Sequence, residues 1–129
     1  MEDVIKSTLE KMKNDKNYHG FAHTLDKDDK RLEKFTRQYN ESGFDDTETW
    51  NLYNTILSFA IPRLKRFRKI NPGVPMGMEV NEWYRIIDSI IVAFELLNDE
   101  TLMLYTDEQQ ALIQKGMDAF SKHITGLWW

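Results

Sequence analysis

The chain contains no cysteine, which excludes disulfide bonds, thiolate catalysis and zinc sites with cysteine ligands. Its longest apolar run, residues 90–94, is far too short to span a bilayer. The amino terminus has no basic segment followed by a long apolar run, so we expect no secretory signal. These absences favour a soluble protein of the reducing cytoplasm.

The familiar catalytic motifs are also missing. No Gly-x-Ser-x-Gly elbow surrounds a serine, no glycine-rich phosphate loop precedes a helix, and no His-Glu-x-x-His pattern occurs. His19 and His23 are four residues apart, a spacing that binds a metal only on a helix, and Gly20 between them favours a loop. We therefore expect no metal, no cofactor and no enzymatic activity.

What is present is typical of one globular helical protein. The 129 residues are 41% hydrophobic and 29% charged, as in an ordinary soluble domain. Apolar residues recur at helical spacing, which predicts an all-α fold, an irregular bundle of about five helices. The predicted helices cover residues 3–17, 26–41, 46–70, 79–98 and 107–125. We expect a single domain over residues 1–129, with 1–43 as charged peripheral helices and 44–129 as the core.

The third predicted helix is expected to be central. Asp45 and Glu48 resemble a capping box at its start. Pro62 lies in its interior and removes one backbone hydrogen bond, so we expect a kink near Ser58, or two helices meeting there. The predicted inward stripe consists of Leu52, Tyr53, Ile56, Leu57, Phe59, Ala60, Leu64 and Phe67.

The sequence also predicts where the other helices begin and end and which of their residues face the core. Asp26 is predicted to cap the second helix, and Gly43 to end it. Residues 71–77 hold two prolines and two glycines and predict a loop. Thr106 and Gln109 form a second capping box. The fourth helix has the clearest period, formed by Trp83, Ile86, Ile87, Ile90, Phe94 and Leu97.

The net charge of −4 disfavours duplex nucleic acid as a partner. Residues 1–43 balance nine bases with nine acids, whereas residues 44–129 hold eight bases and twelve acids, and five of those eight bases lie within residues 62–69. This local positive patch predicts a ligand site for an anion. Bases at a helix carboxyl terminus also complement the helix dipole, which is the alternative interpretation. The predicted ligand-binding residues are Arg63, Lys65 and Arg66, with Trp50, Asn51 and Trp129 beside them.

Two carboxylates stand out on the fourth helix. Glu95 interrupts an apolar run, so we expect it to need a cationic partner, Arg63 or Arg66. Asp88 lies on the same side of the helix, and Arg85 is its predicted neutraliser. Structural ion pairs are the expected role of both; a small hydrolase built on these carboxylates and a metal is the weaker alternative.

Four tryptophans are many for this length, and two of them are the last residues. Trp128 and Trp129 are expected to dock onto the domain or onto a partner chain, which makes a homo-oligomer a reasonable expectation. Trp50 is predicted either to stack a planar ligand or to pack in the core.

Residues 44–67, 83–95 and 127–129 together resemble a group of small proteins encoded by bacteriophages and prophages. The pattern consists of Trp50-Asn51-Leu52, Thr55-Ile56, Pro62-Arg63-Leu64-Lys65-Arg66-Phe67, a Trp-containing helix after a Gly/Pro loop, and a final Leu127-Trp128-Trp129. The resemblance covers about the last two-thirds of the chain. It implies an accessory role in the cytoplasm of a bacterial host, where such proteins often counter host defence by binding an enzyme or a nucleotide signal.

We therefore expect a non-catalytic accessory protein that binds and neutralises a host component. Sequestration of an anionic small molecule, such as a nucleotide defence signal, is the favoured form of this hypothesis. A protein–protein inhibitor of a host enzyme is the main alternative, and a structural role in the virion is another. No membrane partner is expected.

Overall fold

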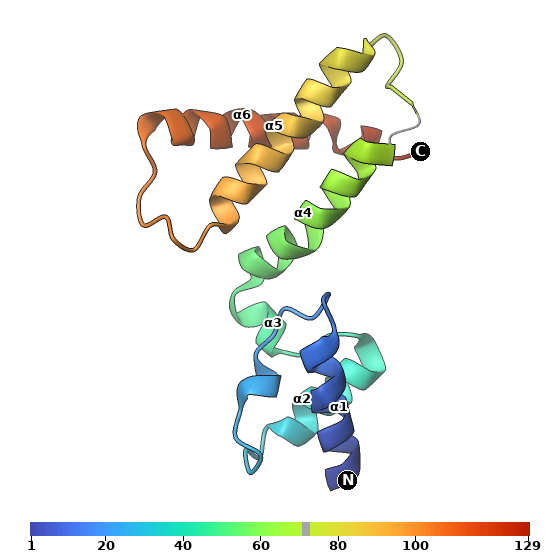
Figure 1. The fold of residues 1–129 in the computed structure, drawn as a ribbon, viewed down its shortest axis with the longest axis vertical. Helices are drawn as coiled ribbons and strands as arrows, with labels where there is room; N and C mark the ends of the chain where they lie inside the picture. The colour runs from blue at the N-terminus through green and yellow to red at the C-terminus, as the bar shows by residue number, and fades with distance from the viewer. Residues whose placement is uncertain (71–72) are drawn as a thin grey trace. The chain divides into compact units, whose positions relative to one another are not determined.

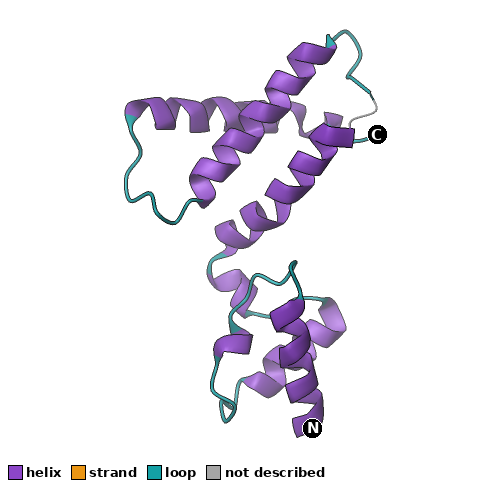
Figure 2. Cartoon of the chain, in the orientation of Figure 1, coloured by secondary structure: helices purple, strands orange, loops and turns teal. Residues whose placement is uncertain are grey.

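Every regular element in this computed structural model is a helix, as Figure 2 shows for the described part of the chain. The structure describes residues 1–70 and 73–129. The predicted all-α class is confirmed, and no strand occurs in those two ranges. Asn71 and Pro72 of the predicted loop lie outside the described residues. None of the described helices combines the length and the apolar character that crossing a bilayer requires.

Six α-helices and two short 3-10 helices make up the described regular structure (Figure 1). They are α1 (Glu2–Asn14), η1 (Ala22–Thr24), α2 (Leu32–Ser42), α3 (Thr47–Trp50), α4 (Leu52–Ile70), α5 (Val80–Asn98), α6 (Asp107–His123) and η2 (Ile124–Gly126). The chain divides into two compact units, unit 1 (Met1–Ile56) and unit 2 (Leu57–Trp129), and the division falls inside α4. The expectation of a single domain, with residues 1–43 at the periphery, stays a prediction.

Unit 1 packs α1, η1 and α2 around a small core. Its buried apolar members are Met12, Tyr18, Ala22, Phe35 and Tyr39. Gly43 ends α2 in the left-handed conformation at φ 83°, as predicted, because a residue without Cβ takes this conformation at no steric cost.

The predicted cap of α2 is wrong, since the helix begins at Leu32 and not near Asp26. The preceding residues form a turn in which the amide of Asp29 donates to the carbonyl oxygen of Asp26 at 2.9 Å. The Asp29 carboxylate then accepts from the backbone and the guanidinium of Arg31. These local bonds compete with helix formation, as aspartate side chains commonly do.

The predicted continuous helix over residues 46–70 is also wrong, because Asn51 separates α3 from α4. Asn51 has non-helical torsions, φ −122° and ψ 62°, and its carbonyl oxygen accepts from the amides of Asn54 and Thr55 at 3.0 and 3.3 Å. The Thr55 hydroxyl donates to the carbonyl oxygen of Glu48 at 2.8 Å and stabilises the break.

The inward stripe of α4 is narrower than predicted. Leu57 and Leu64 are buried, and Ala60, Ile61 and Phe67 pack against them. The other four predicted members are exposed by half or more, which corrects their placement; they are Leu52, Tyr53, Ile56 and Phe59. Their spacing of three and four puts Leu52, Ile56 and Phe59 on another face of the helix from Leu57 and Leu64. The helix continues through Pro62, so two helices do not meet there, and a bend at that point stays a prediction.

Unit 2 is built on α5, which supplies most of its core. Trp83, Ile87, Ile90 and Phe94 are buried, and Ile86 and Leu97 pack against them, so the predicted stripe is confirmed. The predicted Thr106–Gln109 capping box is present at the start of α6. Helix α6 crosses α5 (Figure 1), and the crossing is close at Gly116. A Cβ atom there would overlap the carbonyl oxygen of Ser89 and the Cβ of Ala93.

Candidate functional site

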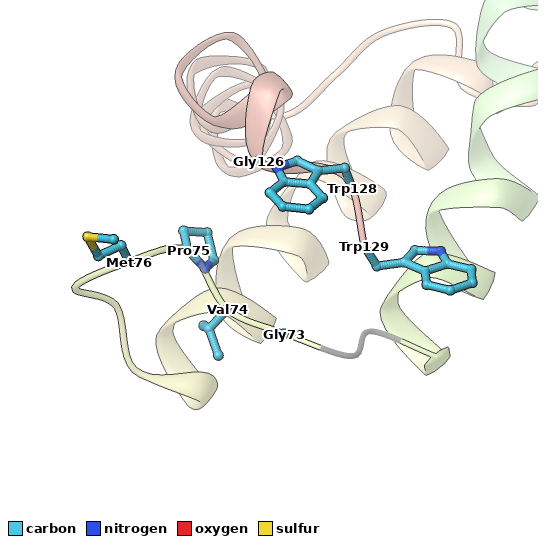
Figure 3. A pocket seen from close by; sticks show the side chains of 7 residues that line it. All are labelled: Gly73, Val74, Pro75, Met76, Gly126, Trp128 and Trp129. Atoms are coloured by element: carbon cyan, nitrogen blue, oxygen red, sulfur yellow. The ribbon is translucent and has the colours of Figure 1, made fainter.

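An open hollow of about 450 Å³ lies at the carboxyl-terminal end of unit 2. Figure 3 shows residues 73–76 of the loop before α5 together with Gly126, Trp128 and Trp129 around it. The indoles of Trp128 and Trp129 are each 75% exposed, and Met76 is fully exposed. The hollow is therefore a shallow apolar surface with two aromatic rings.

The end of the chain is fixed where it enters this hollow. Leu127 packs against the core of unit 2, and the amide of Trp128 donates to the carbonyl oxygen of Gly126 at 3.0 Å. A Cβ at Gly126 would lie 3.3 Å from the ring of buried Trp83, so the backbone runs directly over that indole. The final two tryptophans are thus held at the surface by an anchored backbone instead of being packed inside.

The five bases of α4 are distributed over different sides of the helix. The ammonium of Lys65 lies 3.1 Å from the carboxylate of Glu95, and the guanidinium of Arg68 forms two hydrogen bonds with Asp88, at 2.8 and 3.2 Å. Arg68 also stacks on the ring of Tyr84, with 4.3 Å between the guanidinium carbon and the ring centroid. These bases attach α4 to α5.

The remaining bases of α4 are exposed. The guanidinium of Arg63 lies 3.6 Å from the ring centroid of Phe59 and donates to the carbonyl oxygen of the same residue at 2.9 Å. Arg66 and Lys69 extend the line of exposed bases toward the end of the helix. None of the bases of α4 lines the hollow described above.

Asp88 and Glu95 of α5 both form ion pairs with bases of α4 that were not their predicted partners. Glu95 is exposed and pairs with Lys65, which was not one of its predicted partners. Asp88 pairs with Arg68, not with Arg85. The apolar run around Glu95 suggested burial, but its position on the helix places it at the surface, where its desolvation cost is small.

Unit 1 contains a buried polar network that the sequence did not predict. Asp45 has no exposed surface, and its carboxylate accepts from the Tyr18 hydroxyl at 2.6 Å and from the amide of Thr47 at 2.7 Å. The hydroxyl of Thr47 also donates to Asp45 and accepts from the amide of Phe21 at 3.0 Å. Burial, together with the hydrogen bond to Asp45, raises the pKa of Tyr18 above its ordinary range.

Glu48 completes this network. Its carboxylate accepts from the amide of His19 at 3.0 Å and from the amide of Asp45 at 3.3 Å. The second bond is one half of the predicted capping box, but the N-cap of α3 is Asp46 and the helix has no side-chain cap, so the box itself is not formed. Gly20 lies so close that a Cβ would overlap the Thr47 and Tyr18 hydroxyls. The network fixes the loop of residues 15–25 onto the start of α3, and its carboxylates are occupied by structural bonds.

Trp50 and Asn51, which were predicted to belong to the same ligand site as the bases, are part of unit 1. The other predicted site residues, Arg63, Lys65, Arg66 and Trp129, are part of unit 2. Trp50 is 79% exposed, and its indole makes an edge contact with Phe21, with centroids 5.8 Å apart. Asn51 forms the break between α3 and α4 and is half-buried.

His19 lies in a loop, as expected, whereas His23 is within the short 3-10 helix η1 and His123 is the last residue of α6. His19 Nε2 and His23 Nδ1 are buried without a hydrogen-bond partner, and the His23 ring packs edge-on against Tyr18 at 5.4 Å. Within residues 1–70 and 73–129, no group of three or more side chains is arranged to hold a metal ion.

The interactions missed from the sequence join residues that are far apart along the chain. Tyr18 and Asp45 are separated by 27 residues, and no local pattern marks their contact. The polar spacing of Asp45 and Glu48 was a signal, but it was interpreted only as a helix cap.

Comparison of the chain with protein-family models, with curated proteins and with solved structures gave no match. The resemblance to phage-encoded proteins therefore stays a prediction, and the functional conclusion rests on the geometry of the two units.

Proposed function

We propose that this protein is a non-catalytic accessory protein that binds and neutralises a host protein through its exposed tryptophans. The single observation that carries the proposal is the exposure of Trp50, Trp128 and Trp129, which lies between 75% and 79%. Tryptophan is enriched among the residues that dominate protein–protein binding energy, because its large apolar ring is covered by the partner and its N–H remains available for a hydrogen bond.

The setting of Trp128 and Trp129 supports a protein partner. They border an apolar hollow of about 450 Å³, into which a side chain of a partner can insert. The backbone beneath them is anchored through Leu127, so little conformational entropy would be lost on binding. A catalytic role has less support, since Asp45 and Glu48, the buried carboxylates of unit 1, already accept structural hydrogen bonds.

Capture from a bacterial lysate followed by calorimetry with the purified partner tests this proposal. We expect the double substitution Trp128→Ala and Trp129→Ala, or Trp50→Ala, to weaken binding at least tenfold, as for about 1.4 kcal/mol or more of lost contact energy. Val80→Ala, another exposed apolar position, is the matched control and should leave the affinity unchanged. Binding that is equal in all variants would refute the proposal.

Sequestration of an anionic small molecule is the second candidate, supported by the exposed bases Arg66 and Lys69. Titration with cyclic and linear nucleotides in a calorimeter tests it. Heat that disappears on Arg63→Ala with Arg66→Ala would favour this candidate, and no heat with any nucleotide would remove it.

A further inference from the structure

The outward face of α4 in unit 2 combines exposed apolar and basic side chains. Phe59 and Ile70 are 51% and 37% exposed, and Arg63, Arg66 and Lys69 lie between them at spacings of three and four residues. We call this set the α4 stripe. Helix α4 itself contains no acidic residue.

A second surface of unit 2 has the opposite charge. Residues 99–108, which join α5 to α6 and form the first turn of α6, contain Asp99, Glu100, Asp107 and Glu108, and no base occurs between residues 96 and 114. Met103 and Leu104 at the centre of this segment are 91% and 87% exposed. We call it the acidic loop.

The acidic loop is held in a defined shape although its centre is exposed. Asp99 accepts from the amide and the hydroxyl of Thr101, at 2.9 and 2.6 Å, and the capping box of Thr106 and Gln109 fixes the other end. Tyr105 is half-buried, and its hydroxyl donates to the carbonyl oxygen of Leu96 at 3.4 Å. Presenting Met103 and Leu104 therefore requires little ordering on binding.

We propose that the α4 stripe of one copy of this chain binds the acidic loop of a second copy. The opposite charges of the two surfaces are the reason for choosing a second copy as the partner. The α4 stripe has three bases and no acid, whereas the acidic loop has four acids and no base. Each surface also brings exposed apolar side chains to the contact. Met103 and Leu104 are left almost uncovered by their own chain, and Phe59 keeps half of its surface exposed beneath the Arg63 guanidinium. Two-fold symmetry makes the same contact twice, which doubles the buried area.

This inference is independent of the proposed binding to a host protein, because it uses neither Trp50 nor the carboxyl-terminal indoles. Loss of host-protein binding in the tryptophan variants with an unchanged oligomeric state would separate the two.

Light scattering coupled to size-exclusion chromatography, over a range of protein and salt concentrations, tests the inference on the full chain. The unmodified protein is expected to show twice the monomer mass at low salt and to dissociate as salt rises. Arg66→Glu with Lys69→Glu should weaken association by about tenfold or more, and Glu100→Lys with Glu108→Lys should do the same. Combining all four substitutions in one chain should restore the association.

The control is Lys115→Glu with Lys122→Glu, which makes the same change in net charge at exposed positions on α6. It should leave the mass unchanged, and circular dichroism should show native helix content in every variant. A monomer at all concentrations, an equal effect of the control, or failure of the four-substitution chain to associate would overturn the inference.

Discussion

The two units of this protein form their cores with different chemistry. Unit 1 places the carboxylate of Asp45 and the hydroxyls of Tyr18 and Thr47 in its interior, where they bond to one another. Unit 2 fills its interior with the indole of Trp83 and the aliphatic side chains of α5. Unit 1 therefore depends on a specific set of hydrogen bonds in addition to its small apolar core, whereas unit 2 depends on close packing.

This difference has a consequence for how each unit responds to substitution. An apolar core loses stability in proportion to the volume removed, and its neighbours relax partly into the space. A buried hydrogen-bond network instead loses much of its stabilising effect when one acceptor is removed, because several buried donors then lack a hydrogen-bond partner. The following predictions, from the largest to the smallest effect, test this contrast.

Ile90→Ala should have the largest effect and should act on unit 2. Ile90 is completely buried, and its replacement should lower the free energy of unfolding by about 4 kcal/mol. Hydrogen–deuterium exchange should accelerate in α5 and α6. Val92→Ala on the same helix is the control, because Val92 is 40% exposed and should cost much less. Equal effects at the two positions would contradict the packing argument.

Asp45→Ala should be the most damaging polar substitution and should act on unit 1. It leaves the Tyr18 hydroxyl and the amide and hydroxyl of Thr47 without their acceptor, which should cost about 3 kcal/mol. Exchange should accelerate in residues 15–25 and in α3. Asp45→Asn keeps one carbonyl oxygen as an acceptor and should lower the free energy of unfolding by less than Asp45→Ala does. An equal loss in the two variants would show that the loss does not depend on the remaining acceptor.

Gly20→Ala and Gly116→Ala compare the two units at positions where a methyl group does not fit. The added Cβ overlaps the Thr47 and Tyr18 hydroxyls in unit 1, and the Ser89 carbonyl oxygen and Ala93 Cβ in unit 2. Each change should cost about 2 kcal/mol, measured by urea denaturation followed by circular dichroism. Gly73→Ala meets nothing within 4 Å and is the control. A stabilising effect of either test substitution would show that the neighbours move apart easily.

Alkaline pH should weaken unit 1 through Tyr39. Burial, aided by the hydrogen bond to Asp15 at 2.5 Å, raises the pKa of Tyr39 to about 12. The resulting stabilisation of the folded state is complete below the ordinary pKa of about 10. It is lost as pH rises toward 12, because Tyr39 then loses its proton in the unfolded state while the folded state still keeps it.

Near-ultraviolet absorbance of tyrosinate, recorded with the unfolding transition, measures this effect. Tyr39→Phe should make stability less dependent on pH in that window, at the price of raising the pKa of Asp15, which the Tyr39 hydroxyl lowers. An unchanged pH dependence in Tyr39→Phe would assign the alkaline transition to another group.

Local patterns predicted several features of both units correctly. The apolar period of α5, the capping box of α6 and the glycine stop of α2 all depend on residues within a few positions of one another. The break at Asn51 was missed because the apolar spacing continues across it, although the non-helical torsions of Asn51, φ −122° and ψ 62°, interrupt the helix. The partners of Glu95 and Asp88 were missed because the side of α4 that faces α5 is decided by packing between helices.

For the candidate site, the sequence showed which residues were unusual more clearly than which of them lie together in the structure. The sequence predicted that the terminal tryptophans dock onto the domain or onto a partner, and in the structure Trp128 and Trp129 line a hollow. It did not indicate that Lys65 and Arg68 would bind acids of α5 while Arg66 stays exposed, because that depends on the rotation of α4 about its axis.

The unequal exposure of the four indoles gives the protein its own optical probe. A collisional quencher such as iodide can reach Trp50, Trp128 and Trp129 but not Trp83, whose side chain is almost completely enclosed. Emission from Trp83 therefore provides an internal reference. A molecule that covers the other three rings would protect them from the quencher, so its binding can be measured from the reduced quenching of an unlabelled protein.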